Sequence, residues 1–222
     1  MPTLPEALQH AIERLGLSTV LDVGANEGQF ATGLREGGFE GRIHSYEPGP
    51  AALTRLRAAA ADDPRWTVHA HGLGSAEAEL VLTEYDSSPL SSLHDISTYA
   101  EQTWNFTPGR QVSVPIRRLD AVLPTSDDVL LKIDTQGHDL EVLAGASGCL
   151  RQVRALLIEL SVHALYVGTP SFSAQLARLD ELGFEPIGFW PVNTETAGGV
   201  STNDLRVVEF DGLFLNALSA AG

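Results

Sequence analysis

A glycine-rich turn follows the first apolar run of the sequence, from Asp22 to Gly28 (DVGANEG). Gly24 and Gly28 allow the backbone to bend sharply and let a ligand approach it closely. The dinucleotide-binding pattern G-x-G-x-x-G would require glycine at two positions that hold Asn26 and Gln29. The turn is therefore a poor pyrophosphate cradle. It suits a ligand with an amino-acid end, because Asp22 can receive an ammonium group and the loop amides can receive a carboxylate or a hydroxyl.

An acid ends the second predicted strand at a distance that is typical of nucleoside sites. Glu47 lies 47 − 28 = 19 residues after Gly28, and an acid about 20 residues after such a turn holds the ribose hydroxyls in dinucleotide-binding folds. A carboxylate can accept two hydrogen bonds from a vicinal diol. Pro48 fixes the chain as it leaves the strand. The combination favours a nucleoside site over a solvated loop acid.

Charged residues also lie in and after two later apolar runs. Lys132 and Asp134 are two residues apart, so they share one face of a strand that otherwise looks buried. Buried charges require partners. If the run that ends near Glu159 lies beside this strand, the three side chains form a charged cluster at the carboxyl edge, where open α/β sheets bind ligands. A Lys132–carboxylate pair that only joins two strands is the alternative for Lys132, whereas a functional role is favoured for Asp134.

Two histidines follow the same strands. Either His138 or His163 could be the general base that takes a proton from an acceptor hydroxyl, since imidazole titrates near neutral pH. Asp134, Glu159 and one histidine could also hold a divalent cation. The chain lacks the clustered Asp-Asp or Asp-Asn pair that would support such a site. We therefore predict no metal.

Strands and helices alternate along the chain, which predicts right-handed βαβ units and a parallel sheet. Asp211-Gly212 is a hairpin signal between the last two predicted strands, so the end of the sheet is expected to be antiparallel. The predicted helices cover residues 1–17, 29–36, 51–61, 139–146 and 172–182. The predicted strands cover residues 19–24, 42–48, 66–74, 79–84, 111–116, 128–134, 154–161, 184–190, 205–210 and 212–216.

Composition limits the class of protein. The 222 residues are 43% hydrophobic and 19% charged, which predicts one folded domain over 1–222. The formal net charge of −15 argues against nucleic acid and anionic membranes as partners. Cys149 is the only cysteine, so no intramolecular disulfide can form. No secretory signal pattern is visible, and a cytoplasmic protein is expected.

Two polar or glycine-containing stretches, 85–110 and 191–204, are predicted as substrate or lid loops. Trp104 and Trp190 are candidates for an acceptor pocket, because aromatic rings stack on flat ligand faces. The expected partner is a small-molecule or glycan acceptor. The oligomeric state is left open, with a homodimer among the alternatives.

Five segments in order, LDVGANEGQF, SYEPGP, GLGS, SSL and KIDTQGHDLEVLAGA, resemble the FkbM-type methyltransferases. These belong to the class I S-adenosylmethionine-dependent fold, and the resemblance runs from about residue 19 to 216. It implies a Rossmann-like, doubly wound α/β sheet of seven strands in the order 3-2-1-4-5-7-6, mostly parallel with an antiparallel C-terminal strand. It also implies methyl transfer, usually to a hydroxyl of a sugar, polyketide or other natural product or glycan.

The same resemblance implies where S-adenosylmethionine, and its product S-adenosylhomocysteine, would bind. The methionine end would contact the first turn, the ribose the second strand, the adenine the third, and the SSL element would close over the cofactor. The implied cofactor residues are Asp22, Gly24, Ala25, Asn26, Gly28, Glu47, Pro48, Leu73, Gly74, Ser91, Ser92 and Asp134. Gln136 and His138 depart from a more typical E-G-F run, which concerns the acceptor rather than the cofactor.

Two other function classes share parts of this pattern. An NAD(P)-dependent oxidoreductase would share the fold and the ribose acid, but the glycine spacing argues against it. A non-catalytic nucleoside-binding protein would bind the cofactor without methylating an acceptor. The predicted cluster of Lys132, Asp134 and Glu159 argues against this second class, because such charges cost stability unless they are used. N-methylation would use much the same site as O-methylation.

Overall fold

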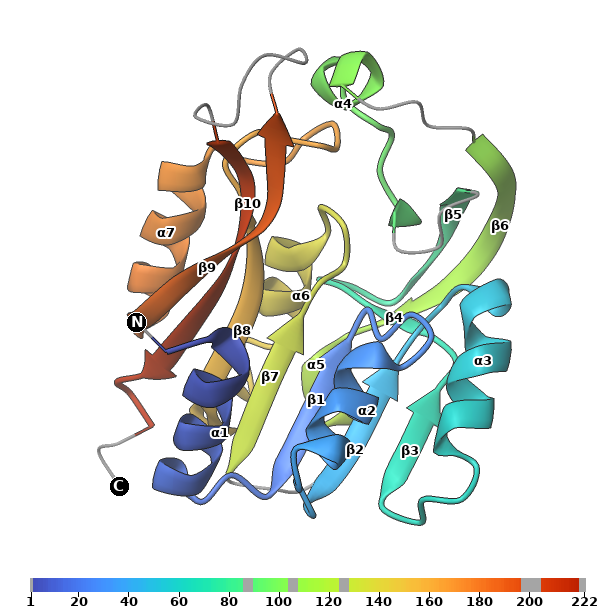
Figure 1. Ribbon diagram of the computed structural model, residues 1–222. Helices are drawn as coiled ribbons and strands as arrows, with labels where there is room; N and C mark the ends of the chain where they lie inside the picture. Colours follow the sequence, from blue (N-terminus) through green and yellow to red (C-terminus); the bar gives the residue numbers. More distant parts are fainter. Residues whose placement is uncertain (1, 86–89, 104–107, 124–127, 197–204, 220–222) are drawn as a thin grey trace.

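The computed structural model describes residues 2–85, 90–103, 108–123, 128–196 and 205–219. Its main sheet has seven strands in the order β3-β2-β1-β7-β8-β10-β9 (Figure 1). Counted by appearance within this sheet, the order is 3-2-1-4-5-7-6, as predicted. β10 runs antiparallel to both of its neighbours. The members are β1 (Thr19–Val23), β2 (Arg42–Tyr46), β3 (Trp66–His69), β7 (Val129–Ile133), β8 (Val153–Ser161), β9 (Phe184–Thr196) and β10 (Leu205–Asn216).

Helices pack on both faces of this sheet, and the central strands β1 and β7 are buried at every position. One face carries Val20 and Leu130 and is covered by α1 (Leu4–Leu15), α2 (Gln29–Glu36) and α3 (Pro50–Ala60). The other carries Leu21 and Leu131 and is covered by α5 (Leu119–Val122), α6 (Asp139–Gly145) and α7 (Phe172–Glu181). Figure 1 shows this layered arrangement. Neighbouring residues of one strand therefore belong to different hydrophobic cores.

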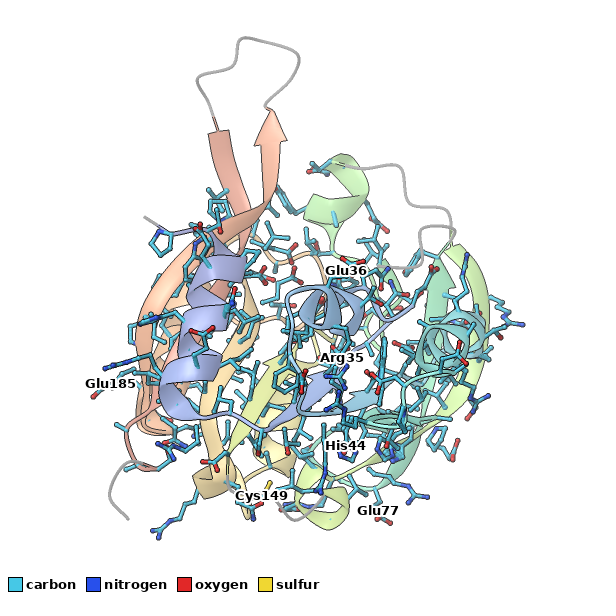
Figure 2. All side chains as sticks on the ribbon, turned by 60° about the horizontal axis from the view of Figure 1, so that its bottom comes forward. Arg35, Glu36, His44, Glu77, Cys149 and Glu185 are labelled. Atoms are coloured by element: carbon cyan, nitrogen blue, oxygen red, sulfur yellow. The ribbon has the colours of Figure 1, made fainter. Side chains whose placement is uncertain are left out.

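The predicted α1 forms with its expected start signal. The hydroxyl of Thr3 accepts a hydrogen bond from the backbone N–H of Glu6, and the Glu6 side chain accepts from the N–H of Thr3, which completes a capping box. Gly16 ends the helix in the left-handed conformation. Side chains fill the spaces between the helices and the sheet, and the single cysteine, Cys149, is free and buried among them (Figure 2). Within the described ranges, no helix is long and apolar enough to cross a membrane.

A second, three-stranded sheet lies beside the main one, and its order is β4-β6-β5. Its strands are β4 (Gly72–Leu73), β5 (Ala78–Tyr85) and β6 (Pro108–Arg117). The single strand predicted over 66–74 is thus divided, because the chain leaves the main sheet after His69 and pairs with β6 at Gly72 and Leu73. The predicted loop over 85–110 contains α4 (Thr98–Thr103) and the start of β6. A short 3₁₀-helix, η2 (Leu150–Gln152), precedes β8.

The predicted turn at Asp211-Gly212 is wrong. Both residues lie inside β10, where Asp211 faces Glu159 of β8 and Trp190 of β9. Pairing on both sides of the strand outweighs the local turn preference. The hairpin instead joins β9 to β10, and its connection (197–204) lies outside the described residues. The predicted lid loop over 191–204 is corrected in part, since β9 continues to Thr196.

Candidate functional site

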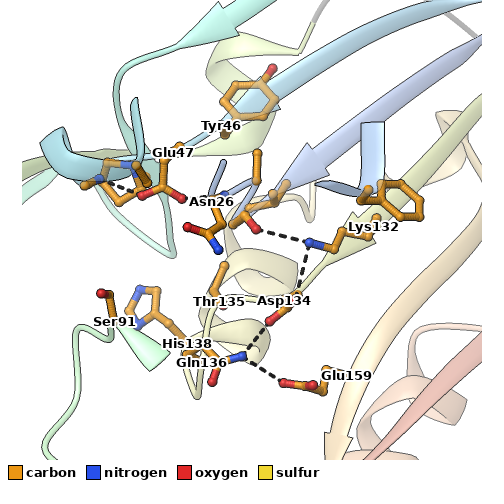
Figure 3. A pocket seen from close by; sticks show the side chains of 18 of the residues that line it. Asn26, Tyr46, Glu47, Ser91, Lys132, Asp134, Thr135, Gln136, His138 and Glu159 are labelled. Atoms are coloured by element: carbon orange, nitrogen blue, oxygen red, sulfur yellow. Dashed lines mark hydrogen bonds and ion pairs between the residues drawn. The ribbon is translucent and has the colours of Figure 1, made fainter. Parts of the chain in front are cut away.

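A cavity of about 560 Å³ opens at the carboxyl edge of the parallel strands, between the main sheet and the second sheet (Figure 3). Parallel strands place their carboxyl ends at one edge, which is where open α/β sheets bind ligands. The volume is in the range of small-molecule and cofactor sites. The polar residues that line the cavity are Asn26, Gln29, Glu47, Glu84, Ser91, Lys132, Asp134, Thr135, Gln136, His138, Glu159 and Asp211.

The turn between β1 and α2 is built from left-handed residues. Gly24, Asn26 and Gly28 have φ values of 73°, 48° and 92°. A Cβ atom on Gly24 would lie 1.8 Å from the backbone oxygen of Asp134, so only glycine allows β1 and β7 to converge there. Gly24, Ala25 and Asn26 line the cavity, whereas Gly28 packs against the ring of Trp66 instead.

Glu47 follows β2 and faces the cavity with only 9% of its surface exposed. Its carboxylate accepts hydrogen bonds from the backbone N–H groups of Asn26, at 2.8 Å, and of Gly49, at 2.7 Å. Burial raises the pKa of Glu47 to about 7, although these two hydrogen bonds lower it. Pro48 and Gly49 line the same wall. The carboxylate is therefore held rigidly at the cavity, with acceptor capacity left for a ligand.

Lys132 is the centre of a buried ionic group. Its Nζ lies 3.2 Å from Oδ1 of Asp22 and 3.4 Å from Oδ2 of Asp134, and it donates to the backbone oxygen of Gly24 at 3.1 Å. Burial lowers the pKa of Lys132, but the carboxylates of Asp134 and Asp22 outweigh it, and the pKa lies above its ordinary value. Phe30 of α2 packs near the ammonium group. Lys132 thus fits both the structural and the functional interpretation, because it joins two strands and also lines the cavity.

The structure corrects the prediction for Asp22. This side chain is 0% exposed and does not line the cavity. Its carboxylate faces Lys132 and accepts a hydrogen bond from the hydroxyl of Ser45. Burial raises the pKa of Asp22, and Lys132 opposes the shift. Asp22 is therefore already paired with the ammonium group of Lys132, and the ammonium group of a bound ligand would contact other residues.

Gln136 joins the two acids that the sequence placed in one cluster. Its Nε2 donates to Oδ1 of Asp134 at 2.7 Å and to Oε2 of Glu159 at 3.0 Å (Figure 3). Its Oε1 accepts a hydrogen bond from the hydroxyl of Tyr166 at 2.8 Å. An amide nitrogen thus occupies the space between the two carboxylates that a shared divalent cation would need.

Acidic residues surround Glu159 and change its protonation. Burial raises the pKa of Glu159 well above its ordinary value, and the charges of Asp134, Glu209, Asp139 and Asp211 raise it further. Asp211, which lines the cavity beside it, has a pKa raised to about 6, first by burial and then by Asp134. In contrast, 36% of the Asp134 side chain is exposed. Asp134 is therefore the accessible acid of this group.

The predicted histidines and tryptophans separate into different places. His138 is buried and lines the cavity, where burial lowers its pKa. His163 stacks on Tyr99 and is not among the lining residues. Trp190 donates its indole N–H to the backbone oxygen of Pro2, so it joins β9 to the N-terminus rather than forming an acceptor pocket. Trp104 lies outside the residues that the structure describes.

Some of the residues predicted to flank the adenine or to close over the cofactor line the cavity, and others do not. Leu73 and Ser91 line the cavity, but Gly74 and Ser92 do not. Gly74 lies against the ring of His138, where a Cβ atom would come within 2.8 Å of its Nε2. The hydroxyl of Ser92 donates to the backbone oxygen of Gln136, which fixes the 90–96 segment over the loop after β7. Gly74 and Ser92 therefore contact residues that line the cavity but do not line it themselves.

Sequence reasoning did not identify several lining residues. Gln136 was noted only as a departure from the family run, and the sequence signal for its role is its place three residues after the buried strand β7; its backbone is left-handed, with φ of 55°. Glu84 of β5 accepts from the N–H of Ala51 and pairs with Arg110. Asp211 was not identified because Asp211-Gly212 has the sequence of a turn. Five acids line the cavity (Glu47, Glu84, Asp134, Glu159 and Asp211), and Lys132 is the one lysine or arginine among these lining residues.

Comparison with known proteins agrees with this geometry. The family described as "Methyltransferase FkbM domain" matches residues 22–186. The chain is 28% identical over 148 residues to "Methyltransferase 1" of Beauveria bassiana, covering 58% of each chain. It is 25% identical over 146 residues to "Hexuronic acid methyltransferase AglP" of Haloferax volcanii, covering 64% of this chain and 55% of that one. The chain thus spans little more than half the length of these curated relatives.

A solved structure shares the fold. The methyltransferase FkbM of Methylobacillus flagellatus KT superimposes with a TM-score of 0.55 at 17% identity, over 89% of this chain and 43% of that one. At this identity the likeness concerns the fold alone, and it agrees with the observed mixed α/β sheet. The family match extends over more than half of the 222 residues. The chain therefore belongs to the FkbM methyltransferase domain family.

Proposed function

We propose that this chain is an S-adenosylmethionine-dependent methyltransferase that acts on a hydroxyl group of a sugar, polyketide or other natural product or glycan. The observation that carries the proposal is the charge of the cavity. Five acidic side chains line it, although burial favours the protonated form of Glu159, and the single lining lysine already contacts Asp22, Asp134 and the backbone of Gly24. Such a lining attracts a sulfonium cation and repels the pyrophosphate of a dinucleotide.

The residues around the cavity fit the parts of S-adenosylmethionine. Glu47, held by two backbone amides, offers acceptor oxygens for the two ribose hydroxyls. The turn at Gly24 to Asn26 offers close backbone approach for the amino-acid end. Leu73 and Pro48 supply apolar contact for the adenine. Family membership supports the same assignment.

When bound, S-adenosylmethionine supplies a methyl group activated by a positively charged sulfur. The protein aligns the acceptor oxygen in line with that group, and alignment can contribute about 7–11 kcal/mol in near-attack geometry. Asp134 takes the proton of the acceptor hydroxyl, because it is the accessible carboxylate of the Asp134–Gln136–Glu159 network. Lys132, whose Nζ lies 3.4 Å from Oδ2 of Asp134, holds this carboxylate in position. His138 is the alternative base, since it also lines the cavity.

The lining also favours one type of acceptor. The Haloferax volcanii relative is named for a hexuronic acid, which is an anion at neutral pH. In this chain both Asp134 and Asp211 line the cavity, so a carboxylate on the acceptor would meet repulsion. We therefore propose a neutral polyol, such as a sugar without a carboxyl group, as the acceptor class.

Calorimetric titration and mass spectrometry test the proposal together. S-adenosylhomocysteine is expected to bind, whereas NADH is expected to give no heat at the same concentrations. A panel of sugars and natural-product alcohols is then incubated with S-adenosylmethionine, and a product heavier by one methylene unit is sought. Binding of NADH alone would establish the oxidoreductase alternative. Cofactor binding with no methylated product across the panel would favour the non-catalytic alternative.

A further inference from the structure

Two imidazoles and a carboxylate converge at the wall of the cavity, where His138 is a lining residue. Nε2 of His94 lies 3.0 Å from Nδ1 of His138, and Oε2 of Glu141 lies 4.0 Å from the same Nδ1. One ligand atom from each residue fits within 4.8 Å of the others. We infer that His94, His138 and Glu141 form a binding site for a zinc ion. The proposed methyl transfer uses one of these side chains only in its alternative form, in which His138 is the base.

The separations suit zinc with little rearrangement. Zinc is bound by nitrogen and carboxylate oxygen at about 2.0–2.2 Å, usually in a tetrahedron. Two ligands of such an ion lie about 3.3 Å apart, which is close to the 3.0 Å between the two imidazole nitrogens. The Glu141 oxygen, now 4.0 Å from His138 Nδ1 and within 4.8 Å of the His94 nitrogen, would have to approach the two histidines by about 0.7–1.5 Å. Its side chain is 43% exposed and is free to make that movement.

The backbone fixes the two histidines independently of any metal. His138 caps the N-terminus of α6, and Glu141 follows three residues later, so both face the same side of the helix. The hydroxyl of Ser92 accepts from the N–H of His94 at 3.0 Å and donates to the oxygen of Gln136 at 2.6 Å. Burial lowers the pKa of His138, which favours its neutral imidazole. A neutral imidazole has the lone pair that a metal requires.

Zinc at this site would join two segments that are distant in the sequence. His94 belongs to the 90–96 segment, whose Ser91 and Leu93 line the cavity, and His138 belongs to the loop that follows β7. The ion would therefore hold the cover of the cavity against the start of α6. Three protein ligands leave a fourth position for water, as in many zinc sites.

A second histidine pair provides a matched control. His44 Nδ1 and His69 Nε2, on β2 and β3, lie 3.2 Å apart, which is nearly the same separation. Among the described residues, no third metal-binding side chain is grouped with that pair. If two adjacent imidazoles sufficed, both pairs would take up zinc. If the carboxylate of Glu141 matters, only the His94–His138 pair would do so.

Zinc alone, titrated calorimetrically into metal-free and untagged protein, tests the inference. We expect one zinc per chain, with affinity at least about tenfold weaker in His94→Gln and in Glu141→Gln and unchanged in His69→Gln. Hydrogen exchange of residues 90–96 is expected to slow with zinc in the wild type and not in His94→Gln. Cobalt is expected to give visible absorption bands of a four-coordinate site.

Three results would contradict the zinc site. No zinc uptake by the wild type, uptake unchanged in His94→Gln, or uptake lost in His69→Gln would each overturn the assignment. Circular dichroism shows whether the variants fold, and the half-exposed Glu141 provides a deciding variant if His94→Gln does not. The titration uses neither cofactor nor acceptor, so its failure would leave the proposed methyl transfer unaffected.

Discussion

Glu47→Gln tests the proposed nucleoside site most directly. The carboxylate of Glu47 accepts from the backbone N–H groups of Asn26 and Gly49 and still has lone pairs that face the cavity. A glutamine has the same shape but only one acceptor oxygen. That oxygen can accept from only one of the two backbone N–H groups, and the NH2 group of the glutamine would face the other, so a ribose hydroxyl would lose its acceptor.

The expected loss follows from the strength of hydrogen bonds to charged groups. Such bonds contribute about 1.5–3 kcal/mol. At about 1.4 kcal/mol per tenfold change, S-adenosylhomocysteine should bind about 10- to 150-fold more weakly to Glu47→Gln at pH 8. The matched control is Glu27→Gln. Glu27 is an acid of the same turn, but it pairs with Arg55 and does not line the cavity, so its variant should bind normally.

The raised pKa of Glu47 adds a pH dependence with a defined sign. Its pKa is about 7 in the folded protein, compared with an ordinary value of 4.5. If the ligand requires the ionised carboxylate, affinity should fall about tenfold from pH 8 to pH 6 in the wild type. The stability contribution has the opposite sign, because folding favours the protonated form. It is complete below about pH 4.5 and is lost as the pH rises through about 7.

Isothermal titration at pH 6, 7 and 8 measures the affinity for S-adenosylhomocysteine and its dependence on pH. Thermal melting shows that each variant is folded. In Glu47→Gln the affinity should be weaker, and the part of its pH dependence that Glu47 causes should disappear. Equal affinity of Glu47→Gln and the wild type at pH 8 would refute the ribose assignment. A pH dependence that persists in full in the variant would show that another acid, such as Asp211, is responsible.

Three further variants test the packing and the proposed chemistry. Gly24→Ala should lower the free energy of unfolding by about 3 kcal/mol or more, because its Cβ would overlap the backbone of Asp134. Gly38→Ala, which has a similar φ but open space around it, should lose only about 1–2 kcal/mol in the same urea titration. Lys132→Met leaves the fully buried carboxylate of Asp22 without its partner, so urea titration should show that the free energy of unfolding falls by about 3–5 kcal/mol. A decrease of less than about 1 kcal/mol would contradict the buried pair. Asp134→Asn should lower kcat by at least about 100-fold and change cofactor affinity less, whereas His163→Gln should retain wild-type turnover. Full activity of Asp134→Asn would transfer the role of base to His138.

Local sequence patterns predicted most of the architecture for physical reasons. Buried parallel strands require uninterrupted apolar runs, and the amphipathic helices between them require a period of 3.6, so both signals are strong. α2 forms over the predicted residues, and most of the other helices and strands differ from their predictions by only a few residues at their ends. Gly24, Glu47 and Asp134 were placed at the correct edge, because the end of a parallel strand fixes where its next residues lie.

Tertiary contacts decided what those patterns left open. Asp211-Gly212 has a turn sequence, but pairing with β8 and β9 on either side keeps it extended. Asp22 looked like a ligand for an ammonium group, and only the register of β1 with β7 shows that Lys132 lies beside it. His163 and His138 looked equivalent, yet the path of the chain after each strand places only His138 at the cavity.

The sequence by itself determined most strands and helices, the glycine turn and the acid after the second strand, because each depends on neighbours within a few residues, whereas the strand order followed from the family resemblance. Only the tertiary structure decided which charges are paired inside the protein and which face the cavity. It brought Gln136 between Asp134 and Glu159, and His94 beside His138, across 44 residues of chain. Such contacts depend on how distant segments pack, and no local periodicity encodes that packing.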